Sequence, residues 1–392
     1  MNFATASLAE IAEVAAGGGA PQNADDFTVE GTPFIRAGSL SPLVNGASES
    51  TLEHLTDEVA KEHGLRKFPC NTVVFAKSGM SATKGHVYRL RNEAYVVNHL
   101  AAIIPTDRVV PEFLEHSLRV FSPVRLIQDA AYPSVRLSDV ATMKIPLPPL
   151  AEQRRIAEVL DRAEALRAKR RAALAHLDTL TQSLFLDLFG DPATNPKGFP
   201  KRPLASLVRD DDTINYGVVQ PGDDLEEGIP LVRVGDLVDG KVRHSELKRI
   251  APSIEAAYKR SRLRGDEILV SCVGSIGVVA LADDSVKGFN IARAVARIPL
   301  AETTDRIFMA AYLSTDFVQR YFTNELRTVS QPTLNIKQIS EATVVLPPIA
   351  QQREFTRRVT AVEQLKTAQR VSLAELDALF ATLQHRAFRG EL

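Results

Sequence analysis

The chain has 392 residues, which at about 150 residues per domain predicts two or three domains. Its 47 Lys and Arg residues are balanced by 48 Asp and Glu residues, so the formal charge is −1, and a strongly basic nucleic-acid-binding chain is excluded. Apolar residues make up 45% and charged residues 24%, which is typical of folded proteins and excludes extensive disorder.

The first half of the chain begins with a predicted short helix. Ser7 and Glu10 have the spacing of a capping box, and Gly17–Gly19 provide a stop signal after it. Strands are predicted over residues 34–36, 73–75 and 100–104, which are rich in apolar and β-branched side chains. The turn dipeptide Asn45-Gly46 follows the first of these strands. We therefore expect a mixed α/β domain over residues 1–146.

Residues 151–189 predict one long helix. They contain neither Pro nor Gly, Pro148 and Pro149 precede them, and Gly190 follows. A helix of about 38 residues is about 57 Å long at ~1.5 Å per residue. Apolar positions step by four and three residues, which is typical of a coiled-coil seam. The predicted seam is Val159, Ala163, Leu166, Arg170, Ala173, Leu177, Leu180 and Leu184.

The second half of the chain repeats this order. Pro and Gly residues after Gly190 mark a linker, and strands are predicted over residues 231–233, 268–270 and 294–296. The turn dipeptide Asp239-Gly240 again follows the first strand. This half covers residues 191–345, and a second helical segment covers residues 346–392.

The two halves are copies of one unit. A shift of 199 residues places Leu147–Arg154 on Leu346–Arg353, and the register continues without a gap to Phe189 and Phe388. Two seams of equal length in one chain predict an intramolecular antiparallel helix pair. The alternatives are separate docking arms and an interface between two chains.

No catalytic constellation stands out. Asn195–Phe199 departs from a methyltransferase tetrad, and Asp239 with Glu246–Lys248 is a weak match to a nuclease trio that follows a turn. The histidines do not have metal-ligand spacing, and Cys70 and Cys272 are too far apart in sequence to suggest a zinc cluster. We expect no catalytic residue, no metal site and no cofactor in this chain. Without a signal peptide or a membrane-spanning apolar run, we also expect a cytoplasmic location.

Basic residues cluster at corresponding places in the two halves. Residues 61–91 hold seven basic side chains and one acid, and residues 248–264 hold six basic side chains and one acid. Such a cluster neutralises phosphates while neighbouring polar groups read base edges. A solvated face is the alternative interpretation. The predicted DNA contacts are Lys77, Ser78 and Lys84 in the first half, and Arg260, Arg262 and Ser275 in the second.

The sequence resembles the specificity subunit of a Type I restriction-modification system. The resemblance rests on the duplicated segments Leu147–Arg154 and Leu346–Arg353, on Leu-Asp pairs at 177–178 and 376–377, and on the closing residues 387–392. It implies an α+β protein with two mixed α/β target recognition domains, two long antiparallel coiled-coil helices that separate them, and an internal pseudo-two-fold repeat. The domain boundaries are then 1–146 and 191–345 for the recognition domains, and 147–190 and 346–392 for the spacer helices.

The resemblance also implies partners. Each recognition domain reads one half of a bipartite double-stranded DNA site. The helices set the half-site spacing and dock two modification subunits, which use S-adenosylmethionine, and restriction subunits supply an ATP- and Mg-dependent nuclease. This chain itself is not an enzyme in that reading. Spacer and docking positions are Gln153, Arg154, Leu166, Leu177, Gln352, Arg353, Leu365 and Leu376. The alternative is a coiled-coil scaffold that binds proteins without DNA specificity.

Overall fold

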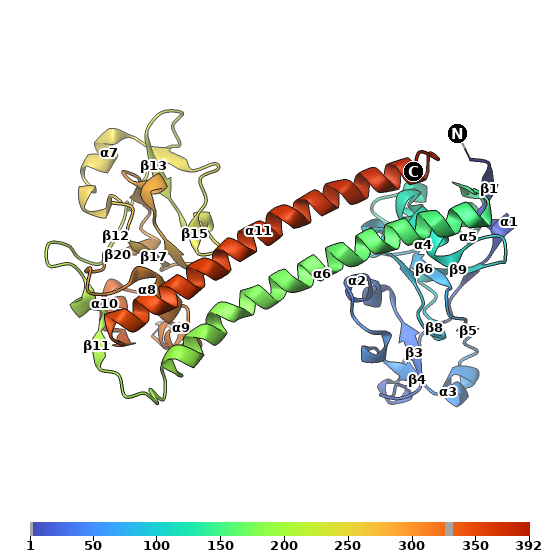
Figure 1. Cartoon of the computed structure of the whole chain (residues 1–392), viewed down its shortest axis with the longest axis horizontal. Coiled ribbons are helices and arrows are strands. Elements are labelled where there is room, and N and C mark those ends of the chain that lie inside the picture. Colours follow the sequence, from blue (N-terminus) through green and yellow to red (C-terminus); the bar gives the residue numbers. More distant parts are fainter. Residues whose placement is uncertain (1–2, 326–331) are drawn as a thin grey trace. The chain divides into compact units, whose positions relative to one another are not determined.

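The computed structural model describes residues 3–325 and 332–392, which form two compact units. Unit 1 consists of Met1–Ala173 with Gln369–Leu392, and unit 2 consists of Leu174–Ala368 (Figure 1). Each unit therefore combines one α/β half of the chain with a part of each long helix.

Unit 1 is built around two sheets. One has the strand order β2-β9-β6-β7, the other has the order β4-β3-β8-β5, and β1 pairs with β10 in a separate ladder. The strands are β1 (Thr5–Ser7), β2 (Ala12–Ala16), β3 (Thr32–Ile35), β4 (His54–Leu55), β5 (Lys67–Phe68), β6 (Val73–Ala76), β7 (Val87–Arg89), β8 (Ala94–Val96), β9 (Leu100–Pro105) and β10 (Lys144–Pro146). The short helices are α1 (Leu8–Ile11), α2 (Leu40–Val44), α3 (Asp57–Glu62), α4 (Pro111–Val120) and α5 (Leu137–Thr142).

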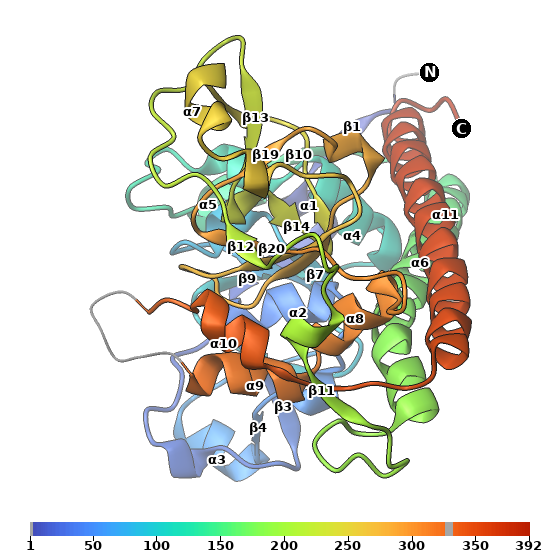
Figure 2. The same cartoon turned by 90° about the vertical axis from the view of Figure 1, so that its left-hand side faces the viewer.

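Unit 2 repeats this plan with different strand lengths. Its main sheet has the order β12-β20-β17-β18-β15-β14, a second has the order β16-β13-β19, and β11 pairs with β21. The strands are β11 (Lys201–Pro203), β12 (Asn215–Tyr216), β13 (Ile229–Val232), β14 (Leu237–Val238), β15 (Lys241–Val242), β16 (Lys248–Ile250), β17 (Ile268–Ser271), β18 (Val279–Leu281), β19 (Asn290–Ile291), β20 (Val295–Ile298) and β21 (Thr343–Val345). Its short helices are α7 (Pro252–Ala256), α8 (Arg306–Leu313), α9 (Asp316–Asn324) and α10 (Ile336–Glu341), of which the last three lie together (Figure 2).

The predicted N-terminal helix is confirmed, but its predicted stop is wrong. The backbone N–H of Ser7 donates to the Glu10 carboxylate at 2.6 Å and closes the capping box of α1. The helix ends at Ile11, because β2 begins directly after it and pairs with β9. Gly17 instead allows close approach of two backbones, since a Cβ atom there would lie 1.9 Å from the carbonyl oxygen of Val96.

The two predicted turn dipeptides differ in outcome. Asp239 and Gly240 both have positive φ, 51° and 74°, and connect the hairpin strands β14 and β15 as predicted. Asn45, in contrast, follows helix α2 as its C-cap, and its side-chain amide donates to the carbonyl oxygen of Ser41. Glycine suits both sites because Gly46 and Gly240 have positive φ, 98° and 74°.

Both long helices are confirmed, as α6 (Leu150–Phe189) and α11 (Ile349–Ala387). They run side by side in opposite directions within each unit (Figures 1 and 2). In unit 1, Nε of Arg167 lies 2.6 Å from the carboxylate of Asp377. In unit 2, Nζ of Lys366 lies 3.3 Å from the carboxylate of Asp178. These two ion pairs are copies of each other under the 199-residue shift, so the antiparallel pairing is intramolecular and repeated.

The seam between the long helices differs from the predicted one at every second position. Leu166 and Leu180, which are predicted to lie in it, are exposed, whereas the following residues Arg167 and Thr181 are half-buried. The observed seam positions on α6 are Ala163, Arg167, Arg170, Leu174, Leu177, Thr181 and Leu184, and on α11 they are Val362, Lys366, Gln369, Leu373, Leu376, Phe380 and Leu383. Arg167 accounts for the shift in unit 1, because it pairs with Asp377 and lies 4.3 Å from the ring of Phe380.

Aromatic and aliphatic cores attach each helix pair to its α/β half. In unit 1, Ile156 and Leu160 of α6 and Phe388 after α11 belong to the core that also contains Phe113 of α4. Unit 2 has a richer aromatic cluster at the same place. It consists of Phe185, Phe189, Phe308, Tyr312 and Phe355, with ring centroids 5.0–6.5 Å apart.

Candidate nucleic-acid interface

Four segments far apart in the sequence converge at the same end of the main sheet in each unit. We call this place the loop junction. In unit 1 it comprises residues 17–19, 77–80, 97–99 and 133–135. In unit 2 it comprises residues 217–219, 272–275, 292–294 and 333–334. The segments 77–80 and 272–275 directly follow the central strands β6 and β17.

Matching main-chain hydrogen bonds hold the two loop junctions. The N–H of Lys77 donates to the carbonyl oxygen of His99 at 2.9 Å, and the N–H of Cys272 donates to that of Ala294 at 2.7 Å. Five further bonds match in the same way, and each is written here with the N–H donor first. In unit 1 they are Gly18–Val96, Asn98–Gly18, Val97–Ile35, Leu100–Val97 and Val135–Lys77. In unit 2 the corresponding bonds, in the same order, are Val218–Ile291, Arg293–Val218, Ala292–Val232, Val295–Ala292 and Leu334–Cys272. Their lengths are between 2.7 and 3.0 Å. The backbone of the junction is therefore the same in both units.

Close backbone approach requires glycine at one position of this shared backbone. A Cβ atom on Gly217 would lie 1.6 Å from the carbonyl oxygen of Ile291, which matches the conflict at Gly17 with Val96. The neighbouring bridges Gly18–Val97 and Val218–Ala292 are both parallel.

The side chains of the two junctions differ although their backbones match. In unit 1, Oγ of Ser78 lies 2.7 Å from Nδ1 of His99, and Met80 and Tyr132 are 68% and 81% exposed beside them. In unit 2, the residue at the position of Lys77 is Cys272, and burial raises its pKa to about 12. Burial likewise raises the pKa of Tyr216 to about 12, so its hydroxyl stays protonated and donates to the carbonyl oxygen of Leu334 at 2.7 Å.

The structure brings half of the predicted DNA contacts to the junctions. Lys77, Ser78 and Ser275 lie in them, and Lys84 is exposed at the end of the 3-10 turn Ala82–Lys84 that follows. Arg260 and Arg262 lie elsewhere, beside a cavity of about 450 Å³ that is also lined by Asp210–Asp212.

Arg262 is committed to an internal ion pair. Its guanidinium donates to both carboxylate oxygens of Glu255, at 2.7 and 2.6 Å, and Glu255 is buried. These hydrogen bonds hold the pKa of Glu255 below its usual value. Arg262 thus has a partner within its own unit, and its predicted DNA contact stays a prediction.

The two predicted basic clusters do not form continuous basic surfaces. In unit 1, Arg66, Lys67 and Arg89 are paired with Glu13, Asp57 and Glu115, at contacts up to 3.2 Å. In unit 2, Arg264 joins Asp211 at 3.5 Å. These acids lie outside the clusters in the sequence, so a count within each cluster does not include them. Only those basic residues of each cluster that have no acidic partner keep an unneutralised charge for DNA phosphates.

Two polar residues of the junctions, Asn98 and Arg293, are absent from the predicted contacts. They follow equivalent strands, are exposed, and occupy the same backbone position. The halves diverge in length between the repeated segments, so the constant shift of 199 residues does not align them. The strand match of Val73 to Ile268 has the appropriate shift and could have identified them.

The predicted spacer and docking positions separate into buried and exposed sets. Gln153 and Gln352 are each 1% exposed and serve as internal anchors. Oε1 of Gln153 accepts from the N–H of Val110 at 2.8 Å, and its Nε2 donates to the carbonyl oxygens of Pro148 and Arg108 at 2.9 and 3.2 Å. Gln352 accepts from the N–H of Asp305 at 2.9 Å and donates to the carbonyl oxygen of Pro347 at 2.7 Å.

The exposed set lies on the outer faces of the long helices. Arg154 and Arg353 are exposed, and Leu166 and Leu365 are each 53% exposed. Leu177 and Leu376 are half-buried in the seam. Leu379 in unit 1 and Leu180 in unit 2 add a second exposed leucine at matching positions. The same apolar side chains thus remain uncovered in both units.

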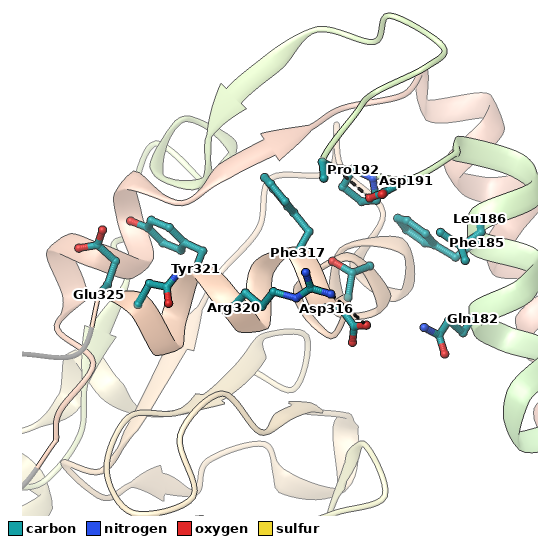
Figure 3. Close-up of a pocket in the computed structure, with 13 residues that line it drawn as sticks. Gln182, Phe185, Leu186, Asp191, Pro192, Asp316, Phe317, Arg320, Tyr321 and Glu325 are labelled. Atoms are coloured by element: carbon teal, nitrogen blue, oxygen red, sulfur yellow. Dashed lines mark hydrogen bonds and ion pairs between the residues drawn. The ribbon is translucent and has the colours of Figure 1, made fainter.

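Unit 2 also contains a cavity of about 600 Å³ between the end of α6, the linker and α9 (Figure 3). Phe185, Leu186 and Phe317 contribute apolar surface to it, and Arg320 and Tyr321 contribute polar groups. Unit 1 lacks the helix α9 that lines this cavity among its described residues. The helix that corresponds to α8 is α4, and a 3-10 turn, Pro123–Leu126, follows it in place of α9. The cavity shares no residue with the loop junction.

Within residues 3–325 and 332–392, no group of three or more His, Cys, Asp or Glu side chains is arranged to hold a metal ion. Over the same ranges, no helix combines the length and apolar character needed to cross a membrane.

The fold and the junctions define a protein of two repeated α/β units that present different side chains on a common backbone. The chain belongs to the family of the Type I restriction modification DNA specificity domain, whose model matches residues 2–176 and 207–375. This confirms the resemblance noted in the sequence. The mixed α/β content, with a long helix between two matched segments, agrees with that family.

Curated relatives carry the same description. The chain is 34% identical over 278 residues to the Type I restriction enzyme EcoBI specificity subunit of Escherichia coli, an alignment that covers 63% of this chain and 58% of that protein. The chain thus matches somewhat more than half the length of that relative. It is 24% identical over 390 residues to the EcoKI specificity subunit of Escherichia coli strain K12, covering 92% and 82%.

Solved structures share the fold. A chain from a structure of type I R-M complex assembly and conformational transition has a TM-score of 0.61 at 20% identity, covering 100% of this chain and 98% of that one. The Type-I restriction-modification S subunit from M. genitalium has a TM-score of 0.59 at 14% identity, covering 99% and 96%. At these identities the match concerns the fold alone.

Proposed function

We propose that this chain is the DNA-binding specificity subunit of a Type I restriction-modification complex. Residues 1–146 and 191–345 serve as target recognition domains, and each reads one half of a bipartite double-stranded site. The helical segments 147–190 and 346–392 set the spacing between half-sites. Family membership supports this assignment.

The observation that carries the proposal is the common backbone of the two loop junctions. Six matched main-chain hydrogen bonds per unit fix the loops, while the exposed side chains differ. A rigid backbone with interchangeable side chains suits two domains that must read different sequences by the same geometry.

The repeated exposed leucines support two copies of one partner. Leu166 with Leu379 in unit 1 and Leu365 with Leu180 in unit 2 are the same helix positions under the repeat. Arg154 and Arg353 repeat a positive charge in the same way. Each set offers exposed apolar side chains, with an exposed arginine further along the same helix. Protein interfaces bury apolar side chains and are enriched in arginine. We assign each set to one modification subunit.

The chemistry in this proposal resides in the partners. The modification subunits would bind S-adenosylmethionine and methylate an adenine in each half-site, and restriction subunits would use ATP and Mg. This chain supplies sequence recognition and geometry and is not itself an enzyme. Weak binding to each half-site adds up only when the site spacing matches the protein.

The direct test is co-expression with the cognate modification subunit, in a host without DNA methylation. Sequencing of modified adenines should reveal one bipartite motif with a fixed spacer. A background-level, sequence-independent pattern would contradict the proposal. Lengthening both helices by whole turns should change the spacer length, since each residue adds ~1.5 Å.

A scaffold without DNA specificity is the alternative, and the family match does not favour it. Gel shifts with the modification subunit present distinguish the two. A specificity subunit retards DNA containing the methylated motif in preference to scrambled DNA, whereas a scaffold retards both equally.

A further inference from the structure

Asn98 and Arg293 occupy one equivalent position in the two loop junctions. The backbone N–H of Asn98 donates to the carbonyl oxygen of Gly18 at 2.7 Å, and that of Arg293 donates to the carbonyl oxygen of Val218 at 2.8 Å. The adjacent residues, Val97 and Ala292, form the matching parallel bridges. The main chain on both sides of each residue is thus fixed in the same way.

Both side chains are exposed and have no hydrogen-bond or ion-pair partner among the described residues. Over residues 3–325 and 332–392, neither the Asn98 amide nor the Arg293 guanidinium makes a hydrogen bond or an ion pair within the chain. Their neighbours behave differently, since His99 contacts Ser78 and Tyr216 contacts the carbonyl of Leu334. Each side chain therefore keeps its hydrogen-bonding groups available to a ligand, from a backbone position that the junction fixes.

The two side chains differ in the base they match. An Asn amide donates to one adenine acceptor and accepts from the adenine amino group, so it pairs with adenine in the major groove. An Arg guanidinium donates two parallel hydrogen bonds to the acceptors of guanine. The pair therefore has the chemistry to distinguish two half-sites from the same backbone position.

We infer that Asn98 reads an adenine–thymine pair in one half-site and that Arg293 reads a guanine–cytosine pair in the other. This inference rests on the proposed function of the chain. Equivalent residues on equivalent backbones contact equivalent positions of the two half-sites. Lys77 and Lys84, which have no ion pair among the described residues, supply phosphate contacts beside Asn98.

The experiment compares motifs rather than activity levels. Wild-type chain, Asn98→Ala and Arg293→Ala are each expressed with the modification subunit, and modified adenines are sequenced. Asn98→Ala should relax one adenine–thymine position in one half-site, with about 10- to 100-fold less discrimination. Arg293→Ala should relax one guanine–cytosine position in the other half-site by a similar factor.

Matched controls are Asn324→Ala and Arg320→Ala, which truncate exposed residues of the same types on α9. Both should leave the motif unchanged. A second variant, Asn98→Asp, keeps an acceptor but loses the donor, so it should shift the relaxed position towards cytosine. This gain of a new preference cannot arise from partial unfolding.

The outcomes separate the inference from the proposed function. An unchanged motif in Asn98→Ala or Arg293→Ala, including one methylated at a lower level, overturns the inference and leaves the proposed function intact. Gel shifts of Arg293→Ala at several salt concentrations give a second readout. A uniform loss of affinity across sequences with a shallower salt dependence would make Arg293 a phosphate contact and also overturn the inference. A wild-type chain without any motif overturns the proposed function and the inference with it.

Discussion

Replacing Gln153 by Ala should destabilise unit 1 by about 3 kcal/mol. The side chain is 1% exposed and makes three hydrogen bonds, one with the N–H of Val110 and two with carbonyl oxygens. A partly buried neutral bond contributes about 1 kcal/mol, and a buried polar group left without a partner costs about 1–3 kcal/mol. The equivalent Gln352→Ala loses two bonds and should destabilise unit 2 by about 2 kcal/mol.

Site-resolved amide hydrogen exchange on the full chain is the suitable assay, because two units need not unfold as one. Gln153→Ala should accelerate exchange of the Val110 amide at least tenfold and leave that of Asp305 unchanged. Gln352→Ala should do the reverse. Gln182→Ala truncates an exposed Gln on α6 and should change stability by less than about 0.5 kcal/mol. Unchanged exchange at Val110 in Gln153→Ala would refute the anchoring role.

Three other predictions concern buried groups. Lys366→Leu replaces a lysine that is 7% exposed at a seam position. Its partners Asp178 and Glu363 have exposed side chains, so water can solvate their carboxylates once the lysine is gone. The thermal unfolding midpoint should therefore stay equal or rise, because desolvation of the lysine charge no longer opposes packing, and a clear drop would contradict this. In the native chain at pH 8, iodoacetamide should alkylate the exposed Cys70 and not Cys272, since burial raises the pKa of Cys272 to about 12 and keeps its thiol neutral. Mass spectrometry of the adducts checks this, and the urea-unfolded chain, in which both thiols are accessible, is the control. Arg297→Met should lower the free energy of unfolding, measured in urea, by about 3–5 kcal/mol, because it leaves the fully buried Glu267 without its ion-pair partner. A second change, Glu267→Gln, should restore part of that loss. Equal stability of the single and double variants would argue against the pair.

The repeat and the long helices could be predicted because their signals are local. A run without Pro or Gly between breakers specifies a helix without reference to the rest of the fold. The match of Leu147–Arg154 to Leu346–Arg353 is likewise visible in the sequence alone, and it also indicated the family whose model matches most of the chain.

Tertiary contacts, and not the sequence pattern, decide which residues of each long helix lie in the seam. Steps of four and three residues fit both Leu166 and Arg167 as seam positions, and hydrophobicity favoured the leucine. Contact with Asp377 and the ring of Phe380 places Arg167 inside, because the long arginine chain packs its methylene groups while its guanidinium is paired. The leucine is left exposed as a result.

The sequence by itself determined that one unit occurs twice, that long helices join the copies and that the chain belongs to the specificity family. Only the tertiary structure decided which polar groups are free. Arg262 lies in a basic cluster yet is neutralised by Glu255, whereas Asn98 stands outside any motif yet is exposed on a fixed backbone. The physical reason is the distance along the sequence over which each interaction acts. Helix formation depends on neighbouring residues, whereas charge pairing and loop convergence depend on residues that folding alone brings together.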